Sequence, residues 1–172
     1  MRKPGHIWLL GLSGSGKSTL GPILASQLKI PFHDMDEIII RSAQRSIPEI
    51  FSIEGESGFR KREAEAIREM AKQQPAVVSS GAGAILVADN RHWMQKTGTR
   101  IYLQTPLELL ERRLRDKQDR PLLAQGSLLS ILTDQLSERE SWYQESEIQI
   151  DAGDSSPAEL AQQIGEILTA QT

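Results

Sequence analysis

Residues 11–18, Gly-Leu-Ser-Gly-Ser-Gly-Lys-Ser, combine a glycine-rich loop with a lysine and a hydroxyl group. Glycines let backbone amides turn toward phosphate oxygens, Lys17 neutralises the β- and γ-phosphates, and the Ser18 hydroxyl can ligate Mg²⁺. An apolar run precedes the loop and a helical pattern follows it, so the positive end of a helix faces the bound anion. The stretch predicts a nucleotide phosphate site that contains Gly14, Ser15, Gly16, Lys17, Ser18 and Thr19.

Two carboxylates follow in "FHDMDEIII", where Asp34 and Asp36 end the strand that we predict over residues 30–36. Residues two apart in a strand point the same way, so both side chains are expected to face the crevice above the sheet. One carboxylate can hold magnesium through water, and the other can orient or deprotonate an attacking hydroxyl. The ordinary alternative is a solvated acidic turn that caps a helix.

Three arginines stand where they could meet an anion. Arg60 follows a glycine-containing turn just inside a charged helix over 56–73, where a surface salt bridge is the common role of an arginine. Arg139 lies on a helix within "LSERESWY". Arg120 belongs to the polar segment 117–126, which we interpret as a mobile lid between two helices. An arginine over the phosphates would stabilise charge during transfer and help to exclude water.

A turn of small residues, Gly81-Ala82-Gly83, follows the strand predicted over residues 76–81. Small residues let a ligand approach the backbone, and successive amides can donate to one oxygen. The alternative is a tight turn between a strand and a helix with no ligand.

Strands and helices alternate along the chain, which favours an α/β fold with a parallel sheet covered on both faces. The expected strands cover residues 7–12, 30–36, 76–81, 100–105 and 146–152. The expected helices cover residues 17–29, 56–73, 106–117 and 155–168, with Leu20, Ile23, Leu24 and Leu28 on the buried face of the first. Ser156, Pro157 and Glu159 are predicted at the N-cap, N1 and N3 positions of the last helix.

Length and composition limit the class of protein. The 172 residues suit one domain over 1–172, and the net charge of −3 offers no electrostatic footprint for nucleic acid. With no cysteine, disulfides and thiol nucleophiles are excluded. No apolar run reaches the length of a membrane span and no signal peptide is apparent, so we expect a cytoplasmic protein, without membrane partners and monomeric.

Together these segments resemble the shikimate kinase family, P-loop enzymes of the aromatic amino-acid pathway. The resemblance covers essentially the whole chain through "GLSGSGKST", "DMD", "IFSIEGESGFR" with Glu63 following, "GAG", "RPLL", the Arg139-x-x-x-Tyr143 pair and "SP" at 156–157. It implies a three-layer kinase fold with a five-stranded parallel sheet and a mobile lid over about 117–126. It also implies an acceptor-binding segment over about 34–62.

The resemblance also implies the roles of individual residues. Asp36 would orient the acceptor's 3-hydroxyl and act as base, Asp34 would join Ser18 at the magnesium ion, and Arg120 would reach ATP from the lid. Arg60 and Arg139 would clamp the shikimate carboxylate, and the Gly81-Ala82-Gly83 turn would donate amides to the acceptor. The residues expected to flank the adenine are Arg113, Ser155 and Pro157.

The implied reaction transfers the γ-phosphoryl of ATP, bound with Mg²⁺, to the 3-hydroxyl of shikimate. One alternative is a P-loop kinase for another small acceptor, such as gluconate or a nucleoside monophosphate. Another is a non-catalytic paralogue that binds a nucleotide or metabolite. "GE-x-x-FR" and "RPLL" argue against the first, and intact Lys17, Ser18, Asp34 and Asp36 argue against the second.

Ala82 departs from the family, which usually has three consecutive glycines in this turn. Alanine keeps the amide, but it costs about 1 kcal/mol if the backbone needs a positive φ, and its methyl narrows the pocket if the acceptor packs there. We therefore predict that Ala82→Gly lowers the KM for shikimate, measured by steady-state kinetics. An unchanged or raised KM would contradict this interpretation.

Overall fold

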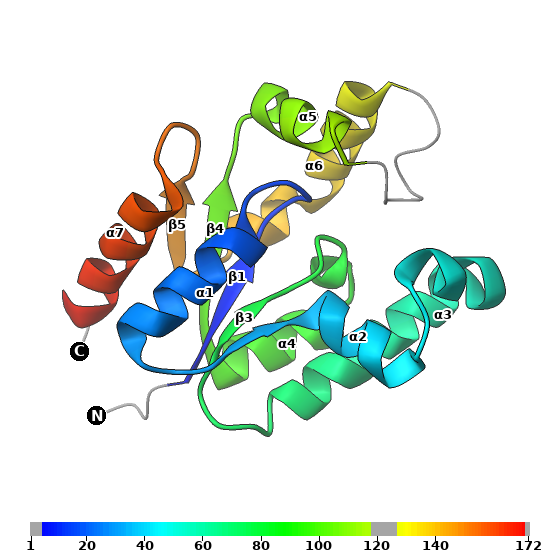
Figure 1. The fold of residues 1–172 in the computed structure, drawn as a ribbon, viewed down its shortest axis with the longest axis horizontal. Helices are drawn as coiled ribbons and strands as arrows, with labels where there is room; N and C mark the ends of the chain where they lie inside the picture. The colour runs from blue at the N-terminus through cyan, green and yellow to red at the C-terminus, as the bar shows by residue number, and fades with distance from the viewer. Residues whose placement is uncertain (1–4, 118–126, 171–172) are drawn as a thin grey trace.

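One five-stranded parallel sheet forms the centre of the molecule, in the order β2-β3-β1-β4-β5. The structure is a computed structural model and describes residues 5–117 and 127–170. The strands are β1 (His6–Leu10), β2 (Phe32–Asp34), β3 (Val77–Ser79), β4 (Gly98–Gln104) and β5 (Ile148–Asp151). The predicted α/β class with a five-stranded parallel sheet is confirmed (Figure 1).

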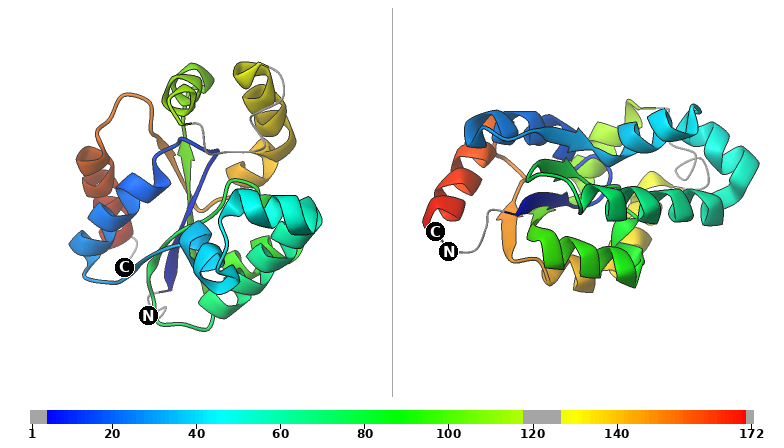
Figure 2. Two further views of the ribbon diagram at one scale, coloured as in Figure 1. Left: turned by 45° about the vertical axis from the view of Figure 1, so that its right-hand side comes forward. Right: turned by 90° about the horizontal axis from the view of Figure 1, so that it is seen from below.

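Helices connect successive strands and cover both faces of the sheet. They are α1 (Lys17–Leu28), α2 (Met35–Ala43), α3 (Ile47–Met70), α4 (Ala88–Thr97), α5 (Leu107–Arg115), α6 (Leu128–Gln144) and α7 (Pro157–Ala170), with a 3-10 turn η1 (Ala84–Leu86). In Figure 2, α1 and α7 lie on one side of the sheet, whereas α3 and α4 lie on the other. The arrangement has three layers.

The central strand β1 supplies both cores because its successive side chains point to opposite faces. Ile7 and Leu9 pack in the cluster that contains residues of α1 and α7. Trp8 and Leu10 pack in the cluster that contains residues of α3, α4 and α6. All four side chains are buried, which explains why β1 appears in the sequence as a continuous apolar run.

Helices α2 and α3 form a unit that projects beyond the sheet (Figure 1) and has its own small core of Ile39, Ile50 and Phe59. Its second helix begins with a capping box between Ser46 and Glu49. The helix is interrupted at Gly55, whose φ of 71° and ψ of −179° are not helical. Arg60 lies in the part of α3 after this break, and its guanidinium reaches Gly83 in the turn that follows β3.

Several sequence-based boundaries were wrong. The strand predicted over 30–36 ends at Asp34, which caps α2, so Asp36 lies in a helix rather than in a strand. The helix predicted over 56–73 begins earlier, at Ile47. Ile23, predicted on the buried face of the first helix, is 39% exposed. Helices α2 and α4 were not predicted, because short helices of mixed polarity carry a weak periodic signal.

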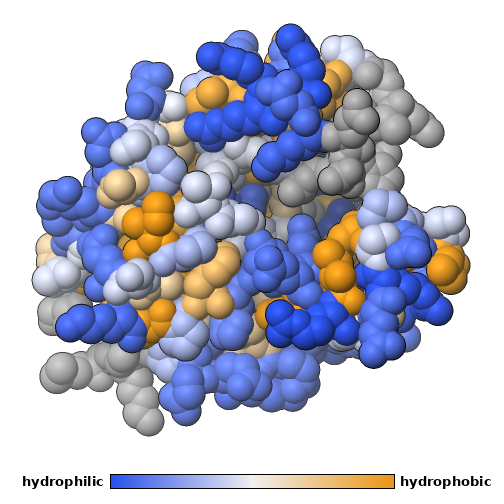
Figure 3. Space-filling view, viewed as in Figure 1, coloured by the Kyte–Doolittle hydropathy of each residue, from blue (hydrophilic) through white to orange (hydrophobic). Residues whose placement is uncertain are grey.

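The surface shown in Figure 3 is largely hydrophilic, with apolar residues dispersed over it. Among the described residues, no helix is both long and apolar enough to cross a bilayer. The exposed large apolar residues in this part of the chain are Ile23, Ile40 and Ile53, which lie on three different helices.

His6 makes the stability of the fold dependent on pH. It is buried at the start of β1, packs against Trp8 with 5.4 Å between ring centroids, and its Nδ1 has no hydrogen-bond partner among the described residues. Burial lowers the pKa of the His6 imidazole, because the charged form is poorly solvated there. The unfolded chain therefore takes up a proton first, and stability is lost as the pH falls below about 6.5.

We predict that His6→Gln flattens the decline in the free energy of unfolding between about pH 7.5 and 5.5. Urea denaturation at several pH values measures this slope. His92→Gln, at an exposed site, is the matched control and should leave the slope unchanged. An unaltered slope in His6→Gln would show that other groups cause the decline.

Candidate active site

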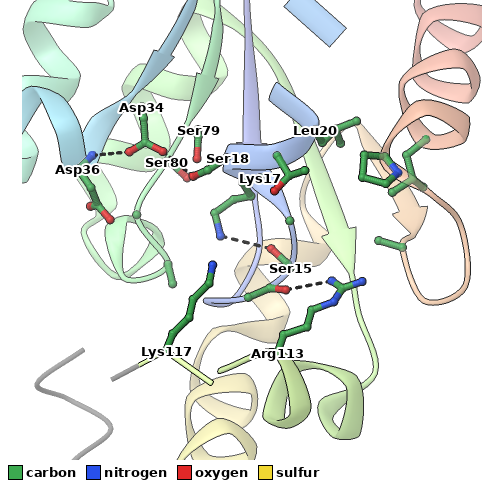
Figure 4. A pocket seen from close by; sticks show the side chains of 18 of the residues that line it. Ser15, Lys17, Ser18, Leu20, Asp34, Asp36, Ser79, Ser80, Arg113 and Lys117 are labelled. Carbon is green, nitrogen blue, oxygen red and sulfur yellow. Dashed lines mark hydrogen bonds between the residues drawn. The ribbon is translucent and has the colours of Figure 1, made fainter. Parts of the chain in front are cut away.

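A cavity of about 380 Å³ opens at the carboxyl ends of the strands, where ligands bind in open α/β sheets. Its lining combines the loop after β1, the start of α2, the turn after β3 and the end of α5 (Figure 4). The predicted site residues that line it are Gly14, Ser15, Gly16, Lys17, Ser18, Thr19, Asp34, Asp36, Gly81, Ala82, Arg113, Ser155 and Pro157.

The loop between β1 and α1 has the backbone that a phosphate site needs. Gly14 and Gly16 have φ values of 85° and 94°, which residues with a side chain rarely adopt. Gly16 is the N-cap of α1 and brings no side chain to the first turn. The positive end of the helix therefore faces the cavity unobstructed.

Lys17 lies almost buried in this loop. Its Nζ donates hydrogen bonds to the carbonyl oxygens of Gly11 at 2.7 Å and Leu12 at 3.0 Å, and to the Ser15 hydroxyl at 3.3 Å. These bonds hold the ammonium at the mouth of the loop, where it can neutralise a phosphate oxygen.

Asp34 joins the loop to α2. Its Oδ2 accepts the Ser18 hydroxyl at 2.5 Å, and its Oδ1 accepts the amides of Asp36 at 2.9 Å and Glu37 at 3.4 Å. This N-cap turns the chain so that Asp36, although helical, still faces the cavity. The two predicted carboxylates thus share the site, for a reason other than strand alternation.

The donor set at Ser18 and Asp34 fits Mg²⁺, which prefers oxygen ligands and usually takes one or two from protein and the rest from phosphate and water. Among the described residues, no cluster of three or more acidic or histidine side chains could hold an ion by itself. With two oxygen donors from the protein, the other positions around such an ion would be left to phosphate and water.

Arg113 and Lys117 add positive charge on the side of the cavity formed by α5. Arg113 donates to the carbonyl oxygen of Gly14 at 3.0 Å, and Lys117 extends toward the phosphate loop in Figure 4. Ser155, just before α7, and Pro157, its first residue, also line the cavity, and the capping box between Ser156 and Glu159 confirms the sequence prediction. Lys117 was missed as a site residue, because an exposed lysine at a helix end is common.

A second group of charges lies beside the turn after β3. Arg60, with its side chain 16% exposed, pairs with the buried Glu63 at 2.9 Å and with Glu56 at 3.6 Å. A side chain at Gly83 would place its Cβ within 2.4 Å of the Arg60 guanidinium, and one at Gly81 would lie 2.5 Å from Glu63 Oε2. The glycines thus give these two charged groups access to the turn.

Glu63 organises this group electrostatically. Burial raises the pKa of its carboxyl, and the nearby Arg60 and Arg139 guanidiniums oppose that rise. Arg139 is itself buried, and the Nε atoms of Arg60 and Arg139 have no hydrogen-bond partner in the described chain. Two nearly buried guanidiniums with Nε donors to spare have the chemistry to bind a carboxylate.

The turn itself presents free donors. Within the described residues, the amides of Gly81, Ala82 and Gly83 donate no hydrogen bond. Ala82 is not among the described residues with a positive φ, which apart from glycines are Lys29 and Gln44. The backbone cost considered for alanine at this position is therefore absent, and the space that its methyl occupies is the remaining effect.

Some predicted features remain apart from the cavity. Arg60, Gly83 and Arg139 do not line it, although Arg60 and Glu63 contact the turn that does. Arg120, and the predicted lid beyond Lys117, lie outside the described residues. Glu63 was noticed only through family resemblance, because its burial against two arginines depends on packing of α3 and α6.

Comparisons with known proteins agree with this geometry. The profile of the family described as "Shikimate kinase" matches residues 13–169. The shikimate kinase of Nitrosomonas europaea is 41% identical over 162 residues, which cover 94% of this chain and 77% of that relative. The structure of the shikimate kinase from Acinetobacter baumannii in complex with shikimate has a TM-score of 0.96 at 35% identity, covering 99% of this chain and 96% of that one.

A gluconokinase from Sinorhizobium meliloti has a TM-score of 0.62 and 22% identity, with 100% of this chain and 99% of that one covered. At this identity the likeness shows a common fold and gives no support to gluconate as the acceptor.

The contact between Gly83 and Arg60 predicts the effect of one methyl group. In Gly83→Ala the new Cβ displaces the guanidinium, and because the guanidinium ends a flexible side chain the fold is retained. Losing a charge-assisted hydrogen bond should raise the KM for shikimate about tenfold or more, with the KM for ATP unchanged. In an Arg60→Ala background, Gly83→Ala should raise the KM for shikimate little further. If the effects of the two substitutions on this KM were fully additive in steady-state kinetics, displacement of Arg60 would not be the cause.

Proposed function

The chain belongs to the shikimate kinase family, and from that premise we propose how its residues transfer the γ-phosphoryl group of ATP to the 3-hydroxyl of shikimate. The products are shikimate 3-phosphate and ADP, a step of chorismate and aromatic amino-acid biosynthesis. The observation that carries the assignment is the pair of nearly buried arginines, Arg60 and Arg139, beside the turn and Asp36. Water as acceptor would need no carboxylate receptor.

On the nucleotide side, the amides of the phosphate loop and Lys17 bind the β- and γ-phosphates. Ser18 and Asp34 would hold Mg²⁺, which neutralises phosphate charge when bound. Arg113 and the segment at Ser155 and Pro157 flank the adenine. Their presence in the lining of one cavity together with the phosphate loop supports this assignment. The proposed role of Arg120, stabilising the transferring group, rests on the family resemblance alone.

On the acceptor side, Arg60 and Arg139 bind the shikimate carboxylate, and the free amides of Gly81, Ala82 and Gly83 contact the acceptor. Asp36 orients the 3-hydroxyl toward the γ-phosphate and accepts its proton. The reaction involves little covalent chemistry by the protein, so positioning and charge stabilisation account for most of the acceleration.

As to setting, we propose a cytoplasmic monomer with ATP and shikimate as partners and residues 1–172 acting as one kinase domain. The segment 34–62 would form the acceptor-binding unit, which its small separate core supports. The monomer is supported by the exposed large apolar residues of the described chain, which are three single isoleucines on three different helices, Ile23, Ile40 and Ile53.

The function is tested by ADP release from MgATP with and without shikimate over a range of concentrations. We predict saturable stimulation by shikimate and none by gluconate. Binding of ATP without stimulation by shikimate would favour another acceptor or a non-catalytic paralogue.

Two variants separate the halves of the site. Arg139→Ala should raise the KM for shikimate about 10- to 100-fold, since it removes hydrogen bonds to a charged group. Lys17→Ala should lower kcat about 100-fold or more, since it removes stabilisation of charge that develops during transfer. Unchanged shikimate kinetics in Arg139→Ala would overturn the carboxylate clamp.

A further inference from the structure

Tyr143 connects helix α6 to the turn that we assign to the acceptor. It lies one helical turn after Arg139 and is 1% exposed. Its hydroxyl donates a hydrogen bond of 2.6 Å to the carbonyl oxygen of Ala82, the central residue of the turn. The bond joins residues 61 positions apart in the sequence, so it fixes the end of α6 relative to the loop after β3.

The direction of this bond is fixed by stacking. The Tyr143 ring lies parallel to that of Tyr102 in β4, with 4.9 Å between centroids and an interplanar angle of 10°. Because both rings are buried, Tyr143 has little rotamer freedom. Its hydroxyl therefore acts as a rigid donor aimed at one peptide group.

A second contact joins the same two segments. The Arg91 guanidinium lies over the Trp142 ring, 4.4 Å from its centroid, and donates to the carbonyl oxygen of Ile85 at 2.6 Å. Residues 142 and 143 of α6 are thus tied to residues 85 and 82, on either side of Gly83. Two contacts of different chemistry restrain the turn more strongly than one.

Tyr143 also lies near Arg139, one of the two arginines that we assign to the carboxylate. Burial raises the pKa of its phenol and the nearby Arg139 guanidinium opposes that rise, so the hydroxyl remains a donor at neutral pH. A single side chain therefore lies near the arginine and is bonded to the turn. The peptide planes of a short turn move together, so fixing the Ala82 carbonyl also directs the neighbouring amides.

We propose that Tyr143 is a positioning residue, whose hydrogen bond to Ala82 holds the Gly81-Ala82-Gly83 amides, near Arg139, in the geometry that binds the acceptor. The inference rests on the proposed function and goes beyond it, because Tyr143 itself contacts no reacting atom. It also explains how alanine is accommodated at position 82. Tyr143 recognises the backbone carbonyl there, which alanine and glycine present alike.

The test compares Tyr143→Phe with Tyr102→Phe, which removes the other hydroxyl of the same stacked pair. The Tyr102 phenol, whose pKa burial raises to about 12, makes no hydrogen bond within the described residues. In Tyr143→Phe we expect the KM and the dissociation constant for shikimate to rise roughly three- to tenfold, the effect of one hydrogen bond. kcat and the KM for ATP should stay within about twofold, as for a loss of uniform acceptor binding. Tyr102→Phe should change none of these constants.

The outcomes are distinct. A wild-type enzyme that shikimate does not stimulate would overturn the proposed function and this inference with it. If shikimate stimulates the wild type, three results would overturn the inference alone. The first is an unchanged affinity for shikimate in Tyr143→Phe. The others are equal changes of KM in Tyr143→Phe and Tyr102→Phe, or equal changes of the KM for shikimate and for ATP. If Tyr143→Phe does not fold, Arg91→Gln provides the test. It removes the contact of Arg91 with Trp142 and Ile85, and should therefore also raise the KM for shikimate and leave the KM for ATP unchanged.

Discussion

The ion pair between Glu63 and Arg60 is the interaction on which the proposed acceptor site depends. A carboxylate with its side chain 1% exposed is tolerated only when it is paired, and Arg60 at 2.9 Å and the nearby Arg139 provide the charge. The pair in turn dictates glycine at position 83, where the guanidinium occupies the space of a side chain. With two guanidiniums around one buried carboxylate, this part of the site favours a further anion.

Two anions must meet in a protein whose net charge is −3, and the fold achieves this by separating the positive groups. Lys17, Arg113 and Lys117 surround the phosphate loop, whereas Arg60 and Arg139 belong to α3 and α6 beside the turn after β3. Asp34 at the N-cap of α2 and Asp36 in its first turn add the carboxylates of the same cavity. Local arrangement, rather than overall charge, therefore determines which ligands bind.

The sequence predicted the features that depend on neighbouring residues. The phosphate loop and the cap at Ser156 could be identified because their chemistry lies within a few positions. Asp36 was placed correctly for a wrong reason, since the N-cap at Asp34, not strand alternation, turns it toward the cavity. The approach of Arg60 to Gly83 and of Tyr143 to Ala82 could not be predicted, because each joins helices and turns whose relative placement depends on the packed core.

The two oxygens of the Asp34 carboxylate bond to different parts of the chain, one to Ser18 and the other to the first amides of α2. A ligand that contacts the oxygen bonded to Ser18 also contacts the carboxylate that caps α2, the helix that carries Asp36. Any change that nucleotide binding made at the first oxygen would therefore reach the helix that carries Asp36 through one group, and such coupling would be reciprocal by necessity. The joint between β2 and α2 would consequently allow cooperativity between unlike substrates without a second subunit.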